Sequence, residues 1–220
     1  MDTETKIDGP LETLLLTEGP DDLRVIQSLL RVYRYTGQIR IQHGEGYPQL
    51  RKELKPILED SVLRRVGILI DADDNLSGRW TSIRDRLRQC GCLPPDELPE
   101  AGAIFPGPDG MSVGVWIIPN NALTGALEAF LSLLVPVADQ NWSYAETCVA
   151  GIPQKPKTSQ NWDNKAILHT WLAWQEYPGK EPEQAFVRRY LDPKAEAAQA
   201  LVAWLERLFE LKAESPNDAP

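Results

Sequence analysis

Acidic side chains follow two of the apolar segments in this sequence. Residues 14–22 read LLLTEGPDD and supply Glu18 and Asp22, and residues 67–74 read GILIDADD and supply Asp71 and Asp73. Carboxylates that lie close together repel one another and raise each other's pKa unless a cation neutralises them. Oxygen donors in a chain with only two histidines favour Mg²⁺ or Mn²⁺ over zinc. A site of this kind typically serves metal-assisted phosphoryl chemistry.

The segment DADDNLSG allows three other interpretations. A calcium loop would take Asp71, Asp73 and Asn75 as ligands, but Leu76 stands where its sharp turn needs glycine and Ser82 where it needs a bidentate glutamate. A haloacid-dehalogenase phosphatase also carries Asp-x-Asp after a strand, but after its first strand and usually with Thr or Val at the position of Asn75. In a third interpretation the acids only lie on solvated turns or cap helices. This explains a single acidic motif more easily than the presence of both motifs.

The acids meet only if their segments are neighbouring strands of a parallel sheet. Hydrophobic periodicity predicts strands at 11–17, 38–42, 62–74 and 111–119, an edge strand at 101–105, and helices at 19–35, 47–59, 77–91 and 120–135. We expect the last of these helices to be capped near Asn120 or Asn121. This alternation predicts an α/β fold with a mostly parallel sheet flanked by helices. Ligand sites in such sheets lie at the carboxyl ends of the strands.

The pattern becomes helical after about residue 137. We expect an α/β core at 10–136, a helical extension at 137–212 packed on the core, and a disordered tail at 213–220. In the extension, Trp171, Trp174, Trp204 and His169 have apolar neighbours at helical spacing and are predicted to be buried. The extension is also a candidate face for a partner or for a second copy in a homo-oligomer.

The composition limits location and partners. The chain has 23 Lys and Arg against 32 Asp and Glu, a formal charge of -9, which disfavours binding nucleic acid by bulk charge. No segment predicts a membrane span or a secretory signal. The three cysteines are odd in number and are interpreted as reduced thiols, so a cytoplasmic location is expected.

Two segments carry the residues predicted to contact nucleic acid. Residues 79–88 hold four arginines and one aspartate; Arg79 and Arg84 would contact phosphates beside Trp80. Lys155 and Lys157 lie in the loop PQKPKTSQ and would act as further phosphate contacts. The alternative is an amphipathic helix with a charged outer face and a loop with solvated lysines.

The motifs resemble the topoisomerase/primase (TOPRIM) fold, in which one strand ends in Glu-Gly and a later strand ends in Asp-x-Asp. LLLTEGPDD and GILIDADDNLSG fit both halves of this pattern. The resemblance implies acid/base catalysis by Glu18 and magnesium binding by Asp71 and Asp73.

A wider resemblance covers residues from about 10 to 193. VWIIPNNALTGALEAFL and LHTWLAWQEYPG are similar to an uncharacterised TOPRIM-like family related to the overcoming-lysogenization-defect (OLD) nucleases. The resemblance implies a two-metal nuclease with Asp22 and Glu128 as further ligands and Lys165 as a catalytic lysine. The relatives usually have Asp where this chain has Asn120, which would lower the affinity for a second metal.

The resulting expectation is a nuclease of the TOPRIM class that uses Mg²⁺ or Mn²⁺ to cleave DNA or RNA. The competing hypothesis, favoured by Asn120 and the acidic net charge, is a catalytically weak or inactive TOPRIM-like module that partners an ATPase. The ATPase would be a separate chain, because this one lacks the GKS or GKT of a phosphate-binding loop. A phosphatase using the same acids is a third hypothesis. The choices between DNA and RNA and between endonuclease and exonuclease are left open.

Overall fold

The computed structural model describes residues 6–7, 9–156, 161–179 and 181–212 of the 220-residue chain. The predicted disordered tail at 213–220 and the predicted phosphate contact Lys157 lie outside these residues.

One mixed sheet of six strands forms the centre of the described chain, in the order β1-β3-β2-β4-β6-β5. β3, β2, β4 and β6 run parallel to one another, while β1 and β5 pair antiparallel at the two edges. The bounds are β1 Lys6–Ile7, β2 Thr13–Thr17, β3 Ile41–His43, β4 Arg65–Asp71, β5 Ala103–Pro106 and β6 Ser112–Ile118. The predicted α/β fold with a mostly parallel sheet is confirmed.

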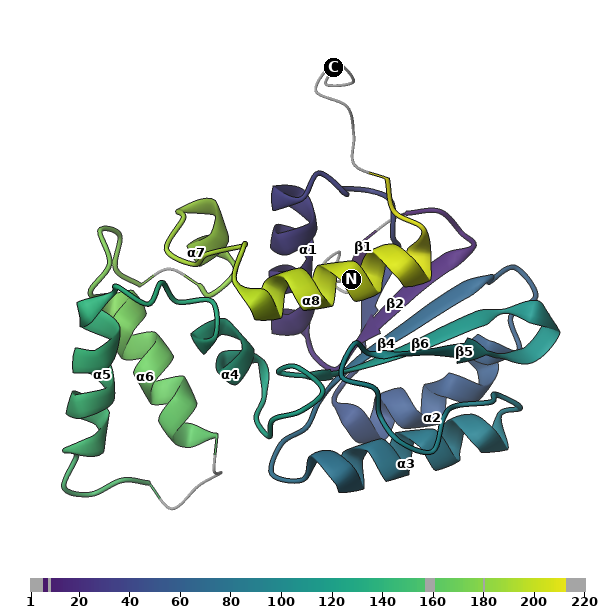
Figure 1. Cartoon of the computed structure of the whole chain (residues 1–220), viewed down its shortest axis with the longest axis horizontal. Helices are drawn as coiled ribbons and strands as arrows, with labels where there is room; N and C mark the ends of the chain where they lie inside the picture. Colours follow the sequence, from purple (N-terminus) through teal and green to yellow (C-terminus); the bar gives the residue numbers. More distant parts are fainter. Residues whose placement is uncertain (1–5, 8, 157–160, 180, 213–220) are drawn as a thin grey trace.

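Helices cover both faces of this sheet (Figure 1). Leu14 and Leu16 of β2 point to one face, where α2 (Tyr47–Leu58) and α3 (Leu76–Gln89) complete a core. Leu15 points to the other face, which is covered by α1 (Pro20–Val32) and α8 (Glu196–Phe209). This alternation of side chains along β2 gives the protein its three layers.

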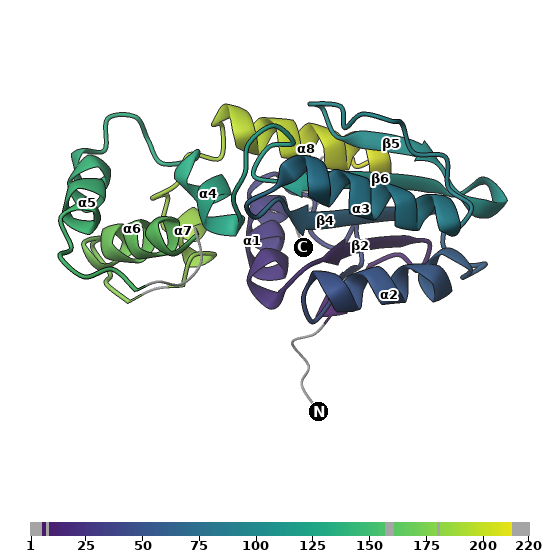
Figure 2. The same ribbon diagram turned by 90° about the horizontal axis from the view of Figure 1, so that it is seen from below.

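The other helices lie to one side of the sheet. α4 (Leu127–Ser132) packs against α6 (Trp162–Ala173), α6 packs against α5 (Gln140–Ala150), and α7 (Gln184–Val187) contacts α1. Figure 2 shows α5, α6 and α7 together, away from the strands. α8 then returns to contact β4 and β6. The division into a core and an extension at residue 136 therefore stays a prediction.

The predicted start of the helix at 120–135 is wrong. Residues 120–126 form turns, and α4 begins only at Leu127. Asn121 is buried with a φ of 61°, and its Oδ1 accepts a hydrogen bond from the Ile117 N–H at 2.7 Å. This side chain therefore stabilises a return to β6 and does not cap a helix.

Two of the four aromatic or imidazole side chains predicted to be buried in the extension are exposed. Trp171 and Trp204 are fully buried, but Trp174 is 40% exposed and its ring lies tilted against that of Tyr144, with ring centroids 5.5 Å apart. His169 also lies at the surface. α6 has apolar residues on more than the face it buries, so periodicity alone could not tell its faces apart. No helix within the described ranges has the length and apolar character needed to cross a membrane.

Candidate active site at the carboxyl ends of β2 and β4

Glu18 and Asp71 lie side by side because their strands are neighbours. Glu18 follows β2, Asp71 ends β4, and the two strands pair in parallel with Thr17 opposite Leu69. The Asp71 N–H donates to Glu18 Oε2 at 3.3 Å. The chain leaves β2 for β3 on one side and then crosses to β4 on the other, so these strands flank the topological switch point, where ligands bind in open α/β sheets.

A constrained turn fixes Asp73 beside them. Asp73 has a φ of 48°, in the left-handed region that few non-glycine residues adopt. Its N–H donates to the Gly125 carbonyl at 2.9 Å, and its carbonyl accepts from the Gly125 N–H at 2.7 Å. The turn before α4 therefore determines where the carboxylate of Asp73 lies.

Arg79, in the first turns of α3, neutralises two of the carboxylates. Its guanidinium forms an ion pair with Asp73 and lies 3.9 Å from Glu18 Oε2. The same group lies over the Tyr47 ring, 3.9 Å from the centroid, which is a cation–π contact. The Arg79 side chain is only 12% exposed. In this arrangement it supplies positive charge between the carboxylates that follow β2 and β4.

Burial and mutual repulsion raise the pKa of three carboxyl groups. Burial is the main cause for Glu18, where Arg79 opposes it. Burial raises the pKa of Asp22 to about 7, opposed by a hydrogen bond from the Gly19 N–H at 2.8 Å. The pKa of Asp71 is raised well above its usual value by burial and then by Asp22 and Glu18. The site therefore binds protons or another cation more readily than exposed carboxylates do.

Glu128 and Lys165 reach the same site from the helices. Glu128, in the first turn of α4, adds to the raised pKa of Asp22 and Asp71, so its charge lies near both. Lys165 on α6 forms an ion pair with Glu128, with 3.4 Å between Nζ and Oε1. The fold thus brings together all the predicted carboxylates and the predicted lysine.

Two other described residues predicted to contact nucleic acid, Arg84 and Lys155, pair with groups outside the carboxylate cluster. Arg84 donates to the Asp85 carboxylate and to the Asp96 carbonyl at 3.0 Å. Lys155 forms an ion pair with Asp163 at 2.9 Å. These contacts tie each side chain to its own local segment.

Asn120 also lies elsewhere. Its Oδ1 accepts hydrogen bonds from the N–H groups of Ala122 and Leu123 at 3.2 and 2.9 Å. It lines a separate hollow of about 570 Å³ with Glu100 and Glu196. The geometry therefore gives no support to Asn120 as the remnant of a metal ligand.

Sequence reasoning missed two polar side chains at the site. Tyr47, at the start of α2, donates from its hydroxyl to Ser82 Oγ at 2.8 Å and lines a hollow of about 360 Å³ with Asp73 and Arg79. Asn161, before α6, donates to Asp73 Oδ1 at 3.4 Å. Tyr47 follows the carboxyl end of β3, at the same edge of the sheet, and this position is the only sequence feature that could have placed it at the site. No sequence feature could have placed Asn161 there.

The oxygen donors of the cluster suit a hard divalent cation, but they do not form a closed cage of protein ligands around it. Among the described residues, no group of three or more His, Cys, Asp or Glu side chains is arranged to hold a metal ion. Mg²⁺ usually needs only one or two carboxylates, with water and substrate oxygens completing its shell. Asp71 Oδ1 is buried without a hydrogen-bond partner, so an oxygen donor of the right kind lies inside the cluster.

Fold and site define the class: an α/β protein with a carboxylate cluster at the switch point of its parallel strands. The chain belongs to a family of proteins of unknown function, DUF3226, whose model matches residues 12–210. The matched range includes the strands that carry the cluster and the helices that contribute Glu128 and Lys165. Searches of curated proteins and of solved structures find no match.

Proposed function

We propose that this protein is a metal-dependent nuclease, or a closely related phosphodiester-cleaving enzyme, that uses Mg²⁺ or Mn²⁺. The observation that carries the proposal is the buried Asp71 carboxylate, which has an unpartnered Oδ1 and lies among Asp22, Glu18, Asp73 and Glu128. Keeping these charges together costs free energy in the folded protein. A site for a divalent cation is a function that accounts for this cost.

The residues divide into three roles in this proposal. Asp71, with Asp22 beside it, would hold the cation, which when bound polarises the phosphate ester. Burial raises the pKa of Glu18, which suits this carboxyl group to general acid/base work. Lys165 and Arg79 supply positive charge next to the carboxylates, where a phosphate must approach.

The TOPRIM relationship is part of the proposal. It is supported by the placement of Glu18 and the Asp71-x-Asp73 pair on adjacent parallel strands, in the chain order that the TOPRIM resemblance implies. A cytoplasmic location also belongs to the proposal. Cys90, Cys92 and Cys148 are free thiols, which suits a reducing compartment.

The proposal is tested by cleavage assays on labelled single- and double-stranded DNA and RNA, with Mg²⁺, with Mn²⁺ and with EDTA. We expect cation-dependent cleavage that falls by about 100-fold or more in Glu18→Gln and Asp71→Asn. The matched control is Glu97→Gln, which removes one negative charge from an exposed loop residue. Equal activity in all three variants would show that the cluster does not catalyse the reaction.

A second candidate is a non-catalytic module that binds a partner such as a separate ATPase. The observation that favours it is Arg79, which already neutralises Asp73 and Glu18 without a metal. Titration calorimetry with Mg²⁺ and Mn²⁺ separates the candidates. Binding that disappears in Asp71→Asn supports the enzyme, whereas no binding by folded wild-type protein, together with no cleavage, supports the module.

A further inference from the structure

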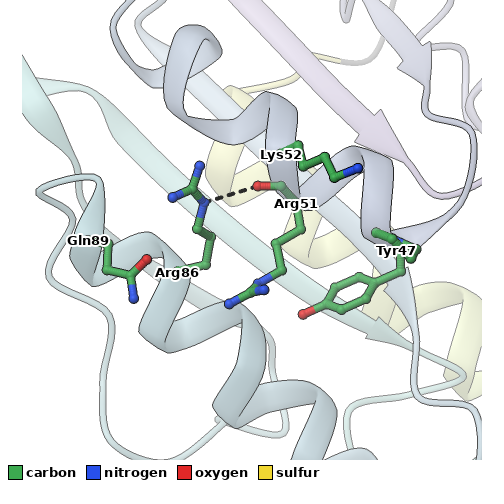
Figure 3. A pocket seen from close by; sticks show the side chains of 6 residues that line it. Tyr47, Arg51, Lys52, Arg86 and Gln89 are labelled. Carbon is green, nitrogen blue, oxygen red and sulfur yellow. Dashed lines mark hydrogen bonds between the residues drawn. The ribbon is translucent and has the colours of Figure 1, made fainter.

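A second hollow lies on the α2 and α3 side of the sheet. Six residues, which we call the α2–α3 groove, line a volume of about 490 Å³: Tyr47, Pro48, Arg51, Lys52, Arg86 and Gln89. In Figure 3, Arg51 extends from α2 toward α3, while Arg86 reaches from α3 back to the backbone of α2. Its Nε donates to the Arg51 carbonyl at 3.1 Å. This hydrogen bond holds the two helices and their cations in a fixed relation.

The charge of the α2–α3 groove is positive and uncompensated. Arg51, Lys52 and Arg86 contribute three cations, and no carboxylate lines the groove. Within the described ranges, none of the ion pairs involves these three side chains. The whole chain carries a formal charge of -9, so this patch opposes the overall charge of the molecule. Such a patch attracts anions to one place on an otherwise repelling surface.

One donor inside the groove lacks an acceptor. Arg51 Nε is buried and has no hydrogen-bond partner. Buried polar groups nearly always have a partner, because a hydrogen bond left unmade in the interior destabilises the fold. A guanidinium is a planar donor set that matches the oxygens of a phosphate. The half-buried Arg51 guanidinium makes no hydrogen bond or ion pair with any other described residue, so its charge is available to a phosphate in the groove.

Tyr47 connects the groove to the carboxylate cluster. It lines the α2–α3 groove and also the smaller hollow that contains Asp73 and Arg79. The Arg79 guanidinium lies over the Tyr47 ring, and the Tyr47 hydroxyl donates a hydrogen bond to Ser82. Tyr47 is therefore held in place between the α2–α3 groove and the smaller hollow. A ligand with several phosphates in a row can place one phosphate at the cluster and another in the groove.

We propose that the α2–α3 groove binds a backbone phosphate of a nucleic-acid strand, next to the phosphate that lies at the carboxylate cluster. The inference rests on the proposed function, since it names the substrate contact of the same site. Arg51 and Arg86 bind the phosphate oxygens, and Lys52 adds charge at the rim. The shared chemistry is a phosphate oxyanion, which a strand or a free nucleotide can supply.

The test measures binding without cleavage. Fluorescence anisotropy of a labelled single-stranded oligonucleotide in EDTA compares wild type with Arg51→Gln/Arg86→Gln. We expect about tenfold or more weaker binding for this variant. The matched control, Arg31→Gln/Arg34→Gln, removes two exposed arginines at the end of α1 on the opposite face and should bind within about twofold of wild type. Equal loss in both variants, or loss in neither, overturns the proposal.

Two further arms separate the possible failures. Arg51→Lys/Arg86→Lys keeps the charge and should bind more tightly than the Gln variant. Thermal melting of each protein shows whether a loss of binding comes from unfolding. Inorganic phosphate and a mononucleotide compete as unlabelled ligands, and competition at the same concentration as the oligonucleotide overturns a strand site in favour of a small phosphorylated ligand.

Groove-dependent binding by a protein that cleaves nothing supports the groove and rejects the proposed enzyme. Cleavage with an unchanged KM in the Gln variant rejects the groove alone.

Discussion

At the level of single residues, Asp22 makes the stability of the protein depend on pH. Its pKa is 3.8 when exposed and about 7 in the folded protein, mainly because the group is buried. Between these values the folded state holds a proton that the unfolded state has released, so the free energy of unfolding falls as the pH rises from about 4 to 7. The change is worth roughly 4 kcal/mol at most.

We therefore predict that Asp22→Asn flattens this part of the stability profile. Asparagine keeps an oxygen that can accept from the Gly19 N–H but carries no charge to bury. Urea unfolding at pH 4, 5.5 and 7 measures the effect, and Asp21→Asn, next to it and exposed, is the control. A profile for Asp22→Asn that stays as steep as that of wild type would contradict the assignment.

Arg79 is the residue whose charge most directly offsets the cluster. Arg79→Gln should lower the free energy of unfolding at neutral pH by about 1–2 kcal/mol, because Glu18 and Asp73 lose their counter-charge while Asp73 remains half exposed. The loss should shrink at acid pH as Glu18 is protonated. Arg88→Gln removes the same charge from the same helix but breaks only an exposed pair with Asp96 and a long hydrogen bond to the Pro94 carbonyl, so it should cost much less. Equal losses in the two variants would rule out the proposed role of Arg79.

At the level of elements, α8 packs on two glycines that lie side by side on the neighbouring strands β4 and β6. Gly67 and Gly114 are paired in register. A Cβ atom at Gly114 would lie 2.6 Å from Leu208 Cδ2 and 3.0 Å from Trp204 Cζ2, too close for either side chain to keep its place. The missing side chains therefore let the last helix lie against the sheet.

Gly114→Ala should lower the free energy of unfolding by about 1–3 kcal/mol through overpacking. Adding Leu208→Ala should recover part of this loss, since it removes the clashing methyl groups. Gly151→Ala is the control, because an added Cβ there comes no nearer than 3.4 Å to another atom. Thermal unfolding of wild type, Gly114→Ala, Leu208→Ala and the double variant measures the coupling, and strictly additive effects would show that α8 does not pack as described.

The sequence predicts helices and strands well where one hydrophobic periodicity is clear. It predicts them poorly where a side chain forms a hydrogen bond with the nearby backbone. β2, β4 and β6 read as apolar runs, and their parallel pairing followed from the intervening helices. The turn at 120–126 read as helix because its capping residues resemble a helix start, while Asn121 in fact bonds back to Ile117. Glu18, Asp71 and Asp73 could be predicted because they lie at or just after the ends of strands, whereas Glu128 was expected only from the family resemblance. Tyr47 and Asn161 could not, because their place at the site depends on how distant elements pack.

At the level of the whole molecule, helices far along the chain complete the site at the sheet. Asn161 contacts Asp73, and Lys165 pairs with Glu128, so α4 and α6 contribute groups to a cluster that begins at Glu18. The family match extends across both parts. The sheet and the side helices therefore belong to one functional unit in our proposal, and neither carries all the residues of the site.

The opposition between overall charge and local charge leads to a last prediction. A chain of formal charge -9 repels nucleic acid at long range, so binding should depend on the few cations of the α2–α3 groove. If Arg51, Lys52 and Arg86 each replace one counterion on a single strand, the logarithm of the binding constant should fall with the logarithm of salt concentration with a slope of about -2. Arg51→Gln/Arg86→Gln should reduce that slope by about 1.4, whereas Arg31→Gln/Arg34→Gln should leave it unchanged. Anisotropy titrations over a range of NaCl concentrations measure the slopes. A much steeper wild-type slope would mean that many more cations contact the strand, and a slope unaffected by the groove variant would place the contact elsewhere on the molecule.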